Sequence, residues 1–315
     1  MRTSKPWYVL GRIGQAVLVL WAAYTVCYII LNLLPADPLA LLLQAKGTDI
    51  GSLNADQIAT LRHTYGLDAG PVQQYLTMLL AALHGDFGTS YTLGQPVLPL
   101  IASRVSSTLA ISLLALVVAV ALAFALAFAA VFTRSRVIRN VLGAIPVIGM
   151  SVPSFWVALL LMQVFSFSLG WFPSMGMQGW KSLVLPTVTM AIPTSALLGQ
   201  LLLSEFDAVL ESPQAVVAKA HGLSRTQVIL HHVVKNASLP SLTILGLLVG
   251  DTFTGAIIAE TIFARQGLGM LIQQAVTQQD VPVVQGAVVL AAGAFVLVNL
   301  IVDLIYPLLD PRIRI

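Results

Sequence analysis

The sequence VSSTLAISLLALVVAVALAFALAFAAVF occupies residues 105–132 and contains no charged side chain. A helix needs about 20 apolar residues to cross the hydrocarbon core of a bilayer, so this stretch is long enough to span a membrane. Five more predominantly apolar stretches of spanning length lie at residues 9–34, 137–169, 183–203, 239–262 and 283–309. The sequence therefore predicts an all-α membrane protein with six transmembrane helices.

The composition indicates the same class. Hydrophobic residues make up 57% of the 315 residues and charged residues only 9%, whereas a soluble domain carries roughly a quarter charged residues. The net charge is only +3, and a nucleic-acid interface would need a denser basic face. We therefore expect the lipid bilayer, and no nucleic acid, as a partner.

Lys and Arg residues are unequally divided between the two sides of these spans. Eleven of the sixteen lie on the side that carries both chain ends, and five lie on the other. Because cytoplasmic loops are enriched in Lys and Arg, both termini are predicted to be cytoplasmic. The first apolar stretch exceeds the roughly 7–15 residues of a signal-peptide core, so residues 1–35 are predicted to be a retained anchor helix.

The segment 36–103 is then extracytoplasmic, and its sequence predicts short helices. Asn54 and Gln57 have the spacing of a capping box, and Pro71 suits the first position of a second helix. An apolar stripe on this second helix leaves two arrangements open, on the bilayer surface or packed against the spans. The stripe comprises Val72, Tyr75, Leu76, Leu79, Leu80 and Leu83.

A second external feature follows Gly267. Apolar and polar residues alternate there with helical spacing, which predicts an amphipathic half-helix too short to span. Its residues Gln274 and Gln278, together with Tyr75, are predicted to form an outer rim for an external partner.

The region 104–315 is predicted to hold the other five spans, and prolines interrupt two of them. Pro146 and Pro153 fall in the third span, and Pro186 and Pro193 fall in the fourth. Each proline removes a backbone donor that neighbouring helices or cavity water must replace. Such kinks suit a moving pathway, for which Pro153 and Ser154 are candidates, and they equally suit static bends.

Two acidic residues lie away from the ends of the predicted spans, Asp251 in the fifth and Asp303 in the sixth. A carboxylate at bilayer depth costs about 2.5–3.5 kcal/mol, so each should face a partner or a water-filled cavity. Pairing with basic groups near the C-terminus explains Asp303. Asp251, flanked by Thr252 and Thr254, is the better pathway candidate, with a structural hydrogen bond as the alternative.

The stretch VVAKAHGLSRTQVILHHVVKNASLP, residues 216–240, is basic and separates two apolar spans. Small side chains before Gly222 allow a neighbouring backbone to approach closely, and Gly222 permits a φ > 0 break between two short helices. The loop 206–238 is therefore predicted to dock into a partner. The contact candidates are Val217, Ala218, Lys219, Ala220, His221, Gly222, Leu223 and Ser224.

The chain shows no constellation for catalysis or metal binding. No GxxxxGK[ST] phosphate loop is present, so ATP hydrolysis would belong to another subunit. All five histidines lie outside the predicted spans, which leaves Ser residues in the bilayer without a base. The single cysteine, Cys27, excludes an intrachain disulfide. We predict no enzyme, no metal and no cofactor bound by this chain.

Ordered motifs along nearly the whole chain resemble the permeases of binding-protein-dependent ABC importers for dipeptides, oligopeptides and nickel. They are NLLPADP at 32–38, PVQQYL at 71–76, GDFGTS at 85–90, SVPSFW at 151–156, GLSRTQVILHHVVKNASLP at 222–240 and ETIFARQGLGML at 260–271. The resemblance implies the type I ABC importer permease fold. It also implies that the loop around Gly222 is the coupling loop, although the charged residues that relatives often carry before Gly222 are missing.

The implied machine contains this chain, a second homologous permease, two cytoplasmic ABC ATPase domains that bind ATP and Mg²⁺, and an extracytoplasmic substrate-binding protein. Peptides are the expected substrates, because the spans offer no Met or His cluster for a bare soft metal ion. Nickel chelates and glutathione remain alternatives for the same machinery. A self-sufficient secondary carrier or channel is the alternative of another class, supported only by Asp251.

Overall fold

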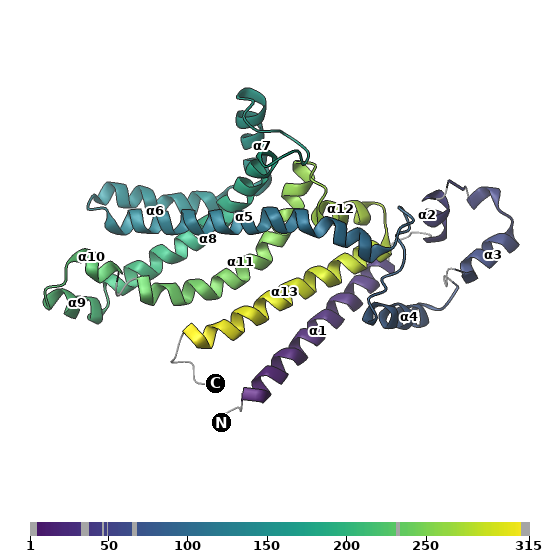
Figure 1. The fold of residues 1–315 in the computed structure, drawn as a ribbon, viewed down its shortest axis with the longest axis horizontal. Coiled ribbons are helices and arrows are strands. Elements are labelled where there is room, and N and C mark those ends of the chain that lie inside the picture. The colour runs from purple at the N-terminus through teal and green to yellow at the C-terminus, as the bar shows by residue number, and fades with distance from the viewer. Residues whose placement is uncertain are drawn as a thin grey trace. The chain divides into compact units, whose positions relative to one another are not determined.

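The computed structural model describes residues 5–32, 38–45, 47–48, 50–64, 68–230 and 234–309 (Figure 1). Its longer helices are α1 (Lys5–Asn32), α5 (Val97–Phe132), α6 (Arg136–Ser151), α8 (Lys181–Leu210), α11 (Val234–Ile262) and α13 (Val281–Leu309). The shorter ones are α2 (Pro38–Ala45), α3 (Ala55–Thr64), α4 (Pro71–Leu83), α7 (Ser154–Leu161), α9 (Pro213–Ala220), α10 (Arg225–Val228) and α12 (Leu268–Thr277). A 3₁₀ turn covers Ile50–Ser52, and a π-helical segment covers Met162–Ser168. The predicted all-α class is confirmed.

Within the described ranges, four helices are long and apolar enough to cross a membrane: α1, α5, α8 and α13. The predicted third span is not one straight helix, because α6 and the segment from Ser154 to Ser168 meet at an angle of 101°. Pro153 explains the break, since a residue before proline is driven out of the helical region and Val152 is extended, with ψ of 124°. Counting this pair gives five spans, and the sixth, α11, stays a prediction.

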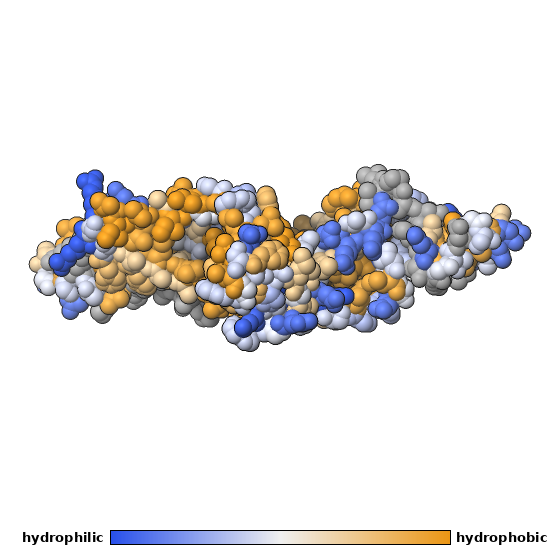
Figure 2. Space-filling view, turned by 90° about the horizontal axis from the view of Figure 1, so that it is seen from above, coloured by the Kyte–Doolittle hydropathy of each residue, from blue (hydrophilic) through white to orange (hydrophobic). Residues whose placement is uncertain are grey.

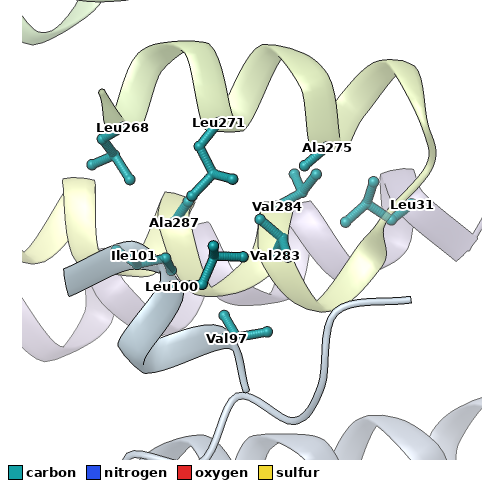
Figure 3. Close-up of a cluster of buried hydrophobic side chains, with 10 residues drawn as sticks. All are labelled: Leu31, Val97, Leu100, Ile101, Leu268, Leu271, Ala275, Val283, Val284 and Ala287. Atoms are coloured by element: carbon teal, nitrogen blue, oxygen red, sulfur yellow. The ribbon is translucent and has the colours of Figure 1, made fainter. Parts of the chain in front are cut away.

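The chain divides into two compact units. The first comprises Met1–Ser107 and Gln266–Val296, and the second comprises Thr108–Arg265 and Leu297–Ile315. Figure 3 shows the apolar core of the first unit, built from the end of α1, the start of α5, α12 and the start of α13. Gly286 lets α13 approach α5, because a Cβ at this position would lie 2.8 Å from Val97. The predicted amphipathic half-helix is confirmed as α12, which buries Leu268, Leu271 and Ala275.

The predicted external helices of the first unit are also present. The capping box of α3 is confirmed, since Asn54 N–H donates to Gln57 Oε1 at 2.9 Å and Gln57 N–H to Asn54 Oδ1 at 2.8 Å. In α4, Tyr75 shares a hydrogen bond of 2.7 Å with Thr25 of α1. Of the other stripe residues, Leu79 is half-buried, and Val72, Leu76, Leu80 and Leu83 are all at least half exposed. The α4 stripe therefore meets a span at Tyr75 and leaves these residues uncovered.

The second unit packs α5, α8 and α11 through small side chains. On α5, a stripe of buried alanines lies at four-residue spacing: Ala115, Ala119, Ala123 and Ala127. Residues four apart share one face of a helix, so these alanines present a continuous stripe of small side chains. The larger side chains of Leu198, Leu202 and Phe206 on α8 lie against it.

Apolar side chains also cover much of the outer surface. Figure 2 shows broad orange areas of hydrophobic residues, and large side chains such as Leu113, Val117 and Val137 are more than half exposed. A monomeric soluble protein rarely exposes apolar patches of this extent. These faces are suited to contact with lipid or with another membrane subunit.

Candidate functional site

The loop around Gly222 forms a compact two-helix element in the second unit. Helix α9 ends where Gly222 adopts φ of +85°, and Leu223 N–H donates to the carbonyl of Ala218 at 3.2 Å. This pairing across five residues is a Schellman motif, which places glycine in the left-handed region. The predicted φ > 0 break is confirmed, and the two arms are α9 and α10.

Serine hydroxyls hold the start of each arm. Ser212 Oγ accepts from Ala215 N–H at 3.3 Å. Ser224 and Gln227 form a capping box, in which Ser224 N–H donates to Gln227 Oε1 at 2.9 Å and Gln227 N–H to Ser224 Oγ at 3.4 Å. The Ser-x-x-Gln spacing of this box is a local sequence signal for the start of α10.

The arms bury one face against each other and expose another. Ala215, Ala218 and Val228 form a small core, so Ala218 packs inside the element and is not on its outer surface. Val216 and Val217 are 57% and 55% exposed. Ala220, His221 and Ser224 are exposed, Leu223 is half-buried, and the side chain of Lys219 lies outside the described part. A shallow groove lies beside Val217 and His221, which leaves a small apolar surface available for a partner.

An ion pair lies close to this element. Arg139, in the first turn of α6, pairs with Asp207, near the end of α8. Phe206, the neighbour of Asp207, is fully buried against α5. The end of α8, which leads into α9, is therefore linked to α6 by the ion pair and to α5 by the packing of Phe206.

The predicted pathway residues differ in their exposure. Asp251 and Thr254 are exposed on α11, whereas Thr252 is buried and donates to the carbonyl of Val249 at 2.6 Å. Pro153 is exposed at the start of α7, and Ser154 is half-buried. Asp251 is therefore not held inside the core of this chain. The side chain of Asp303 lies outside the described residues.

Two other acidic residues are buried instead, and the sequence analysis missed both. Glu260 has no exposed surface and accepts from Thr108 Oγ1 at 2.6 Å. Arg265, which follows α11, is 3% exposed and donates to the carbonyl and Oγ of Ser182, each at 3.1 Å. Burial lowers the pKa of Arg265, and the negative charge of Glu260 opposes this shift. The close spacing of Glu260 and Arg265 in the sequence, across the end of α11, is the signal that could have indicated these buried charges.

The second buried acid is Asp280, between α12 and α13 in the first unit. It is 1% exposed and accepts four hydrogen bonds from the loop before α5. The donors are Ser90 Oγ at 2.5 Å, Tyr91 N–H at 3.0 Å, Thr92 N–H at 3.1 Å and Thr92 Oγ1 at 2.7 Å. Burial and then the charge of Asp280 raise the pKa of Tyr91 to about 12. Asp280 therefore fixes the GDFGTS loop to α13.

The predicted rim residues are also placed differently. Gln274 and Gln278 are exposed on the polar face of α12. Tyr75 instead contacts α1, where its ring lies 5.2 Å from that of Tyr28 and 6.0 Å from that of Tyr24. Of the three predicted rim residues, Gln274 and Gln278 are exposed and Tyr75 is half-buried.

Comparison with known proteins identifies the family. A family model described as "Binding-protein-dependent transport system inner membrane component" matches residues 121–315. The glutathione transport system permease protein GsiC of Salmonella typhi is 34% identical over 307 residues, which cover 98% of each chain. A putative peptide transport system permease protein of Brucella abortus (strain 2308) is 33% identical over 314 residues, covering 97% of this chain and 98% of the relative.

Solved structures support the fold. The crystal structure of an amino acid ABC transporter with histidines has a TM-score of 0.52 at 19% identity, covering 68% of this chain and 94% of that one. An inward-facing structure of the MetNI methionine ABC transporter has a TM-score of 0.53 at 18% identity, covering 67% and 96%. The chain therefore belongs to the family of binding-protein-dependent transport system inner membrane components, with the fold of ABC importer permeases.

Proposed function

We propose that this chain is the permease subunit of an ATP-driven importer of peptides and provides half of the translocation pathway. It would act with a second homologous permease, two cytoplasmic ATPase domains carrying ATP and Mg²⁺, and an extracytoplasmic substrate-binding protein. The observation that carries the proposal is the α9–Gly222–α10 element. Exposed valines on a short, capped helix offer a partner an apolar contact that needs little ordering on binding.

The mechanical part of the proposal follows from how this element is attached. Closure of the ATPases on ATP would move α9 and the adjoining end of α8, and the Arg139–Asp207 pair would transmit the movement to α6. The 101° break between α6 and α7 and the exposed carboxylate of Asp251 would then lie where the two permeases open and close. The chain itself would bind no nucleotide, metal or cofactor.

A charge placed on the exposed valine face tests the coupling. We expect Val217→Glu to prevent ATPase binding and to abolish ATP-driven uptake in liposomes. Thr226→Glu, an exposed position on α10, introduces the same charge in the same loop and should retain uptake. Full ATP-driven uptake by the Val217→Glu complex would contradict the proposal.

The substrate class is tested separately. The relatives named above are a glutathione permease and a putative peptide permease, and glutathione is itself a short peptide. The test measures uptake of labelled dipeptide by the reconstituted complex, with unlabelled glutathione or a nickel chelate as competitor. It distinguishes dipeptides, glutathione and nickel chelates as substrates. We expect dipeptide uptake, altered by Asp251→Asn without loss of complex assembly. Unchanged uptake of several peptides by this variant would remove Asp251 from the pathway.

A further inference from the structure

The first unit contains a cavity of about 600 Å³ outside the coupling element and the pathway candidates. Helix α4 and the loop 86–94 form most of its wall, and α1, α2 and the start of α13 contribute the rest. Sites for small ligands typically enclose about 300–1,000 Å³ and combine apolar walls with a few polar groups. This cavity meets both criteria, with Leu42, Met78 and Phe87 among the apolar residues.

The charged groups of the cavity are all acidic. Asp68 and Asp86 lie at its exposed edge, and no Lys or Arg side chain is among the described residues that line it. Asp86 Oδ1 accepts from Gly88 N–H at 2.8 Å, which fixes the direction of that carboxylate. Tyr24 and Tyr91 add aromatic rings to the wall, and the face of an aromatic ring attracts a cation. The cavity is therefore suited to a positively charged group.

A second observation comes from the inner wall. Gln285 on α13 lines the cavity and is 2% exposed. Its amide Nε2 is buried and has no hydrogen-bond partner in the described part of the protein. Leaving a buried donor unsatisfied is destabilising, so a ligand that supplies an acceptor oxygen here would recover that loss. A ligand that carries both a cation and an acceptor oxygen, such as the carbonyl oxygen of a peptide residue, would satisfy both features.

We propose that this cavity binds a basic peptide residue, with its cationic group between Asp68 and Asp86 and its carbonyl oxygen accepting from Gln285. Such a residue has two sources. It can belong to the extracytoplasmic binding protein, in which case the cavity positions that protein on the permease, or to a free basic peptide. The site itself does not depend on the function proposed above.

The test uses the full-length chain in lipid nanodiscs, with L-argininamide as the probe and agmatine as its comparison. Both carry two positive charges, and only argininamide has a carbonyl group. We expect saturable argininamide binding that weakens at least about tenfold in Asp68→Asn/Asp86→Asn, as expected when charged hydrogen bonds are lost. Asp56→Asn removes one negative charge from α3, outside the cavity, and should leave the affinity unchanged.

Gln285→Leu provides a second, independent measurement. It should abolish the preference for argininamide over agmatine and leave agmatine binding in place. The proposal is overturned if wild-type protein shows no saturable argininamide binding, or if the Asp68→Asn/Asp86→Asn and Asp56→Asn variants bind equally well. Displacement of argininamide by the purified binding protein would support the site and assign the residue to that protein. Displacement by an arginine-containing peptide alone would support the site and assign it to a free peptide.

Discussion

At the scale of single residues, the buried acid Asp280 joins two segments that are far apart in the sequence. One carboxylate satisfies two hydroxyls and two backbone donors of the loop 90–92. Hydrogen bonds to a charged group typically contribute about 1.5–3 kcal/mol each before coupling between them is considered. The loop and the start of α13 should therefore unfold together.

We predict that Asp280→Asn lowers stability by about 1–3 kcal/mol, because one oxygen and the charge are lost while the shape is kept. Thermal unfolding in detergent measures this change. Asp86→Asn is the control, since Asp86 is exposed and the amide oxygen of asparagine can still accept from Gly88. Equal melting temperatures for wild type and Asp280→Asn would show that the four bonds do not hold the loop.

Glu260 and Arg265 lead to a second prediction at this scale. Removing one charge of a buried pair leaves the other uncompensated, at a cost of about 3–5 kcal/mol, whereas removing both can be nearly neutral. Glu260→Gln should therefore destabilise the protein more than the double variant Glu260→Gln/Arg265→Met. A double variant that is the less stable of the two in thermal unfolding would contradict charge compensation between these residues.

At the scale of elements, α4 combines two faces with different surroundings. Tyr75 attaches it to α1, and Tyr28 Oη also donates to the carbonyl of Pro71 at 2.8 Å. These contacts lie in the last third of α1 (Lys5–Asn32), one of the candidate membrane spans. We therefore expect the exposed stripe to lie at the extracytoplasmic interface of the bilayer that α1 spans. The stripe comprises Val72, Leu76, Leu80 and Leu83.

Site-specific quenching tests this position of α4. A bimane label on Leu76→Cys should be quenched strongly by brominated lipids, and the same label on the neighbouring Thr77→Cys should be quenched weakly. Successive residues of a helix point about 100° apart, so the two labels report on different faces of α4. Equal quenching at both positions would show that the stripe does not contact lipid.

Sequence periodicity predicted most individual elements because their signals are local. The capping box at Asn54 and the φ > 0 break at Gly222 depend on residues a few positions apart, and both are present. The pairing of Ser90 with Asp280 joins residues 190 positions apart, and no local pattern contains that information. The partners of a buried acid can likewise lie far away in the sequence. The hydropathy pattern therefore identified Asp251 as the acidic residue that needs a partner and did not identify Glu260.

At the scale of the whole molecule, the third span shows the limit of hydropathy. An apolar stretch of 33 residues at 137–169 is long enough for one tilted helix, and hydropathy does not report the direction of the chain. Pro153 indicates where the helix breaks. It does not indicate the angle of the break, which is 101°. The pairing of spans around the break depends on packing between helices, which composition does not determine.

The orientation of the molecule gives the last prediction. Eleven of sixteen Lys and Arg residues lie on the side of the two termini, and that excess should retain this side in the cytoplasm. With Cys27 replaced by alanine, an impermeant maleimide should label Gly51→Cys in intact cells, because residue 51 lies in the predicted external segment. Thr226→Cys in the loop 206–238, which we propose couples to the ATPases, should react only after the membrane is opened. The opposite pattern would invert the topology, and it would place the α9–Gly222–α10 element out of reach of any cytoplasmic ATPase.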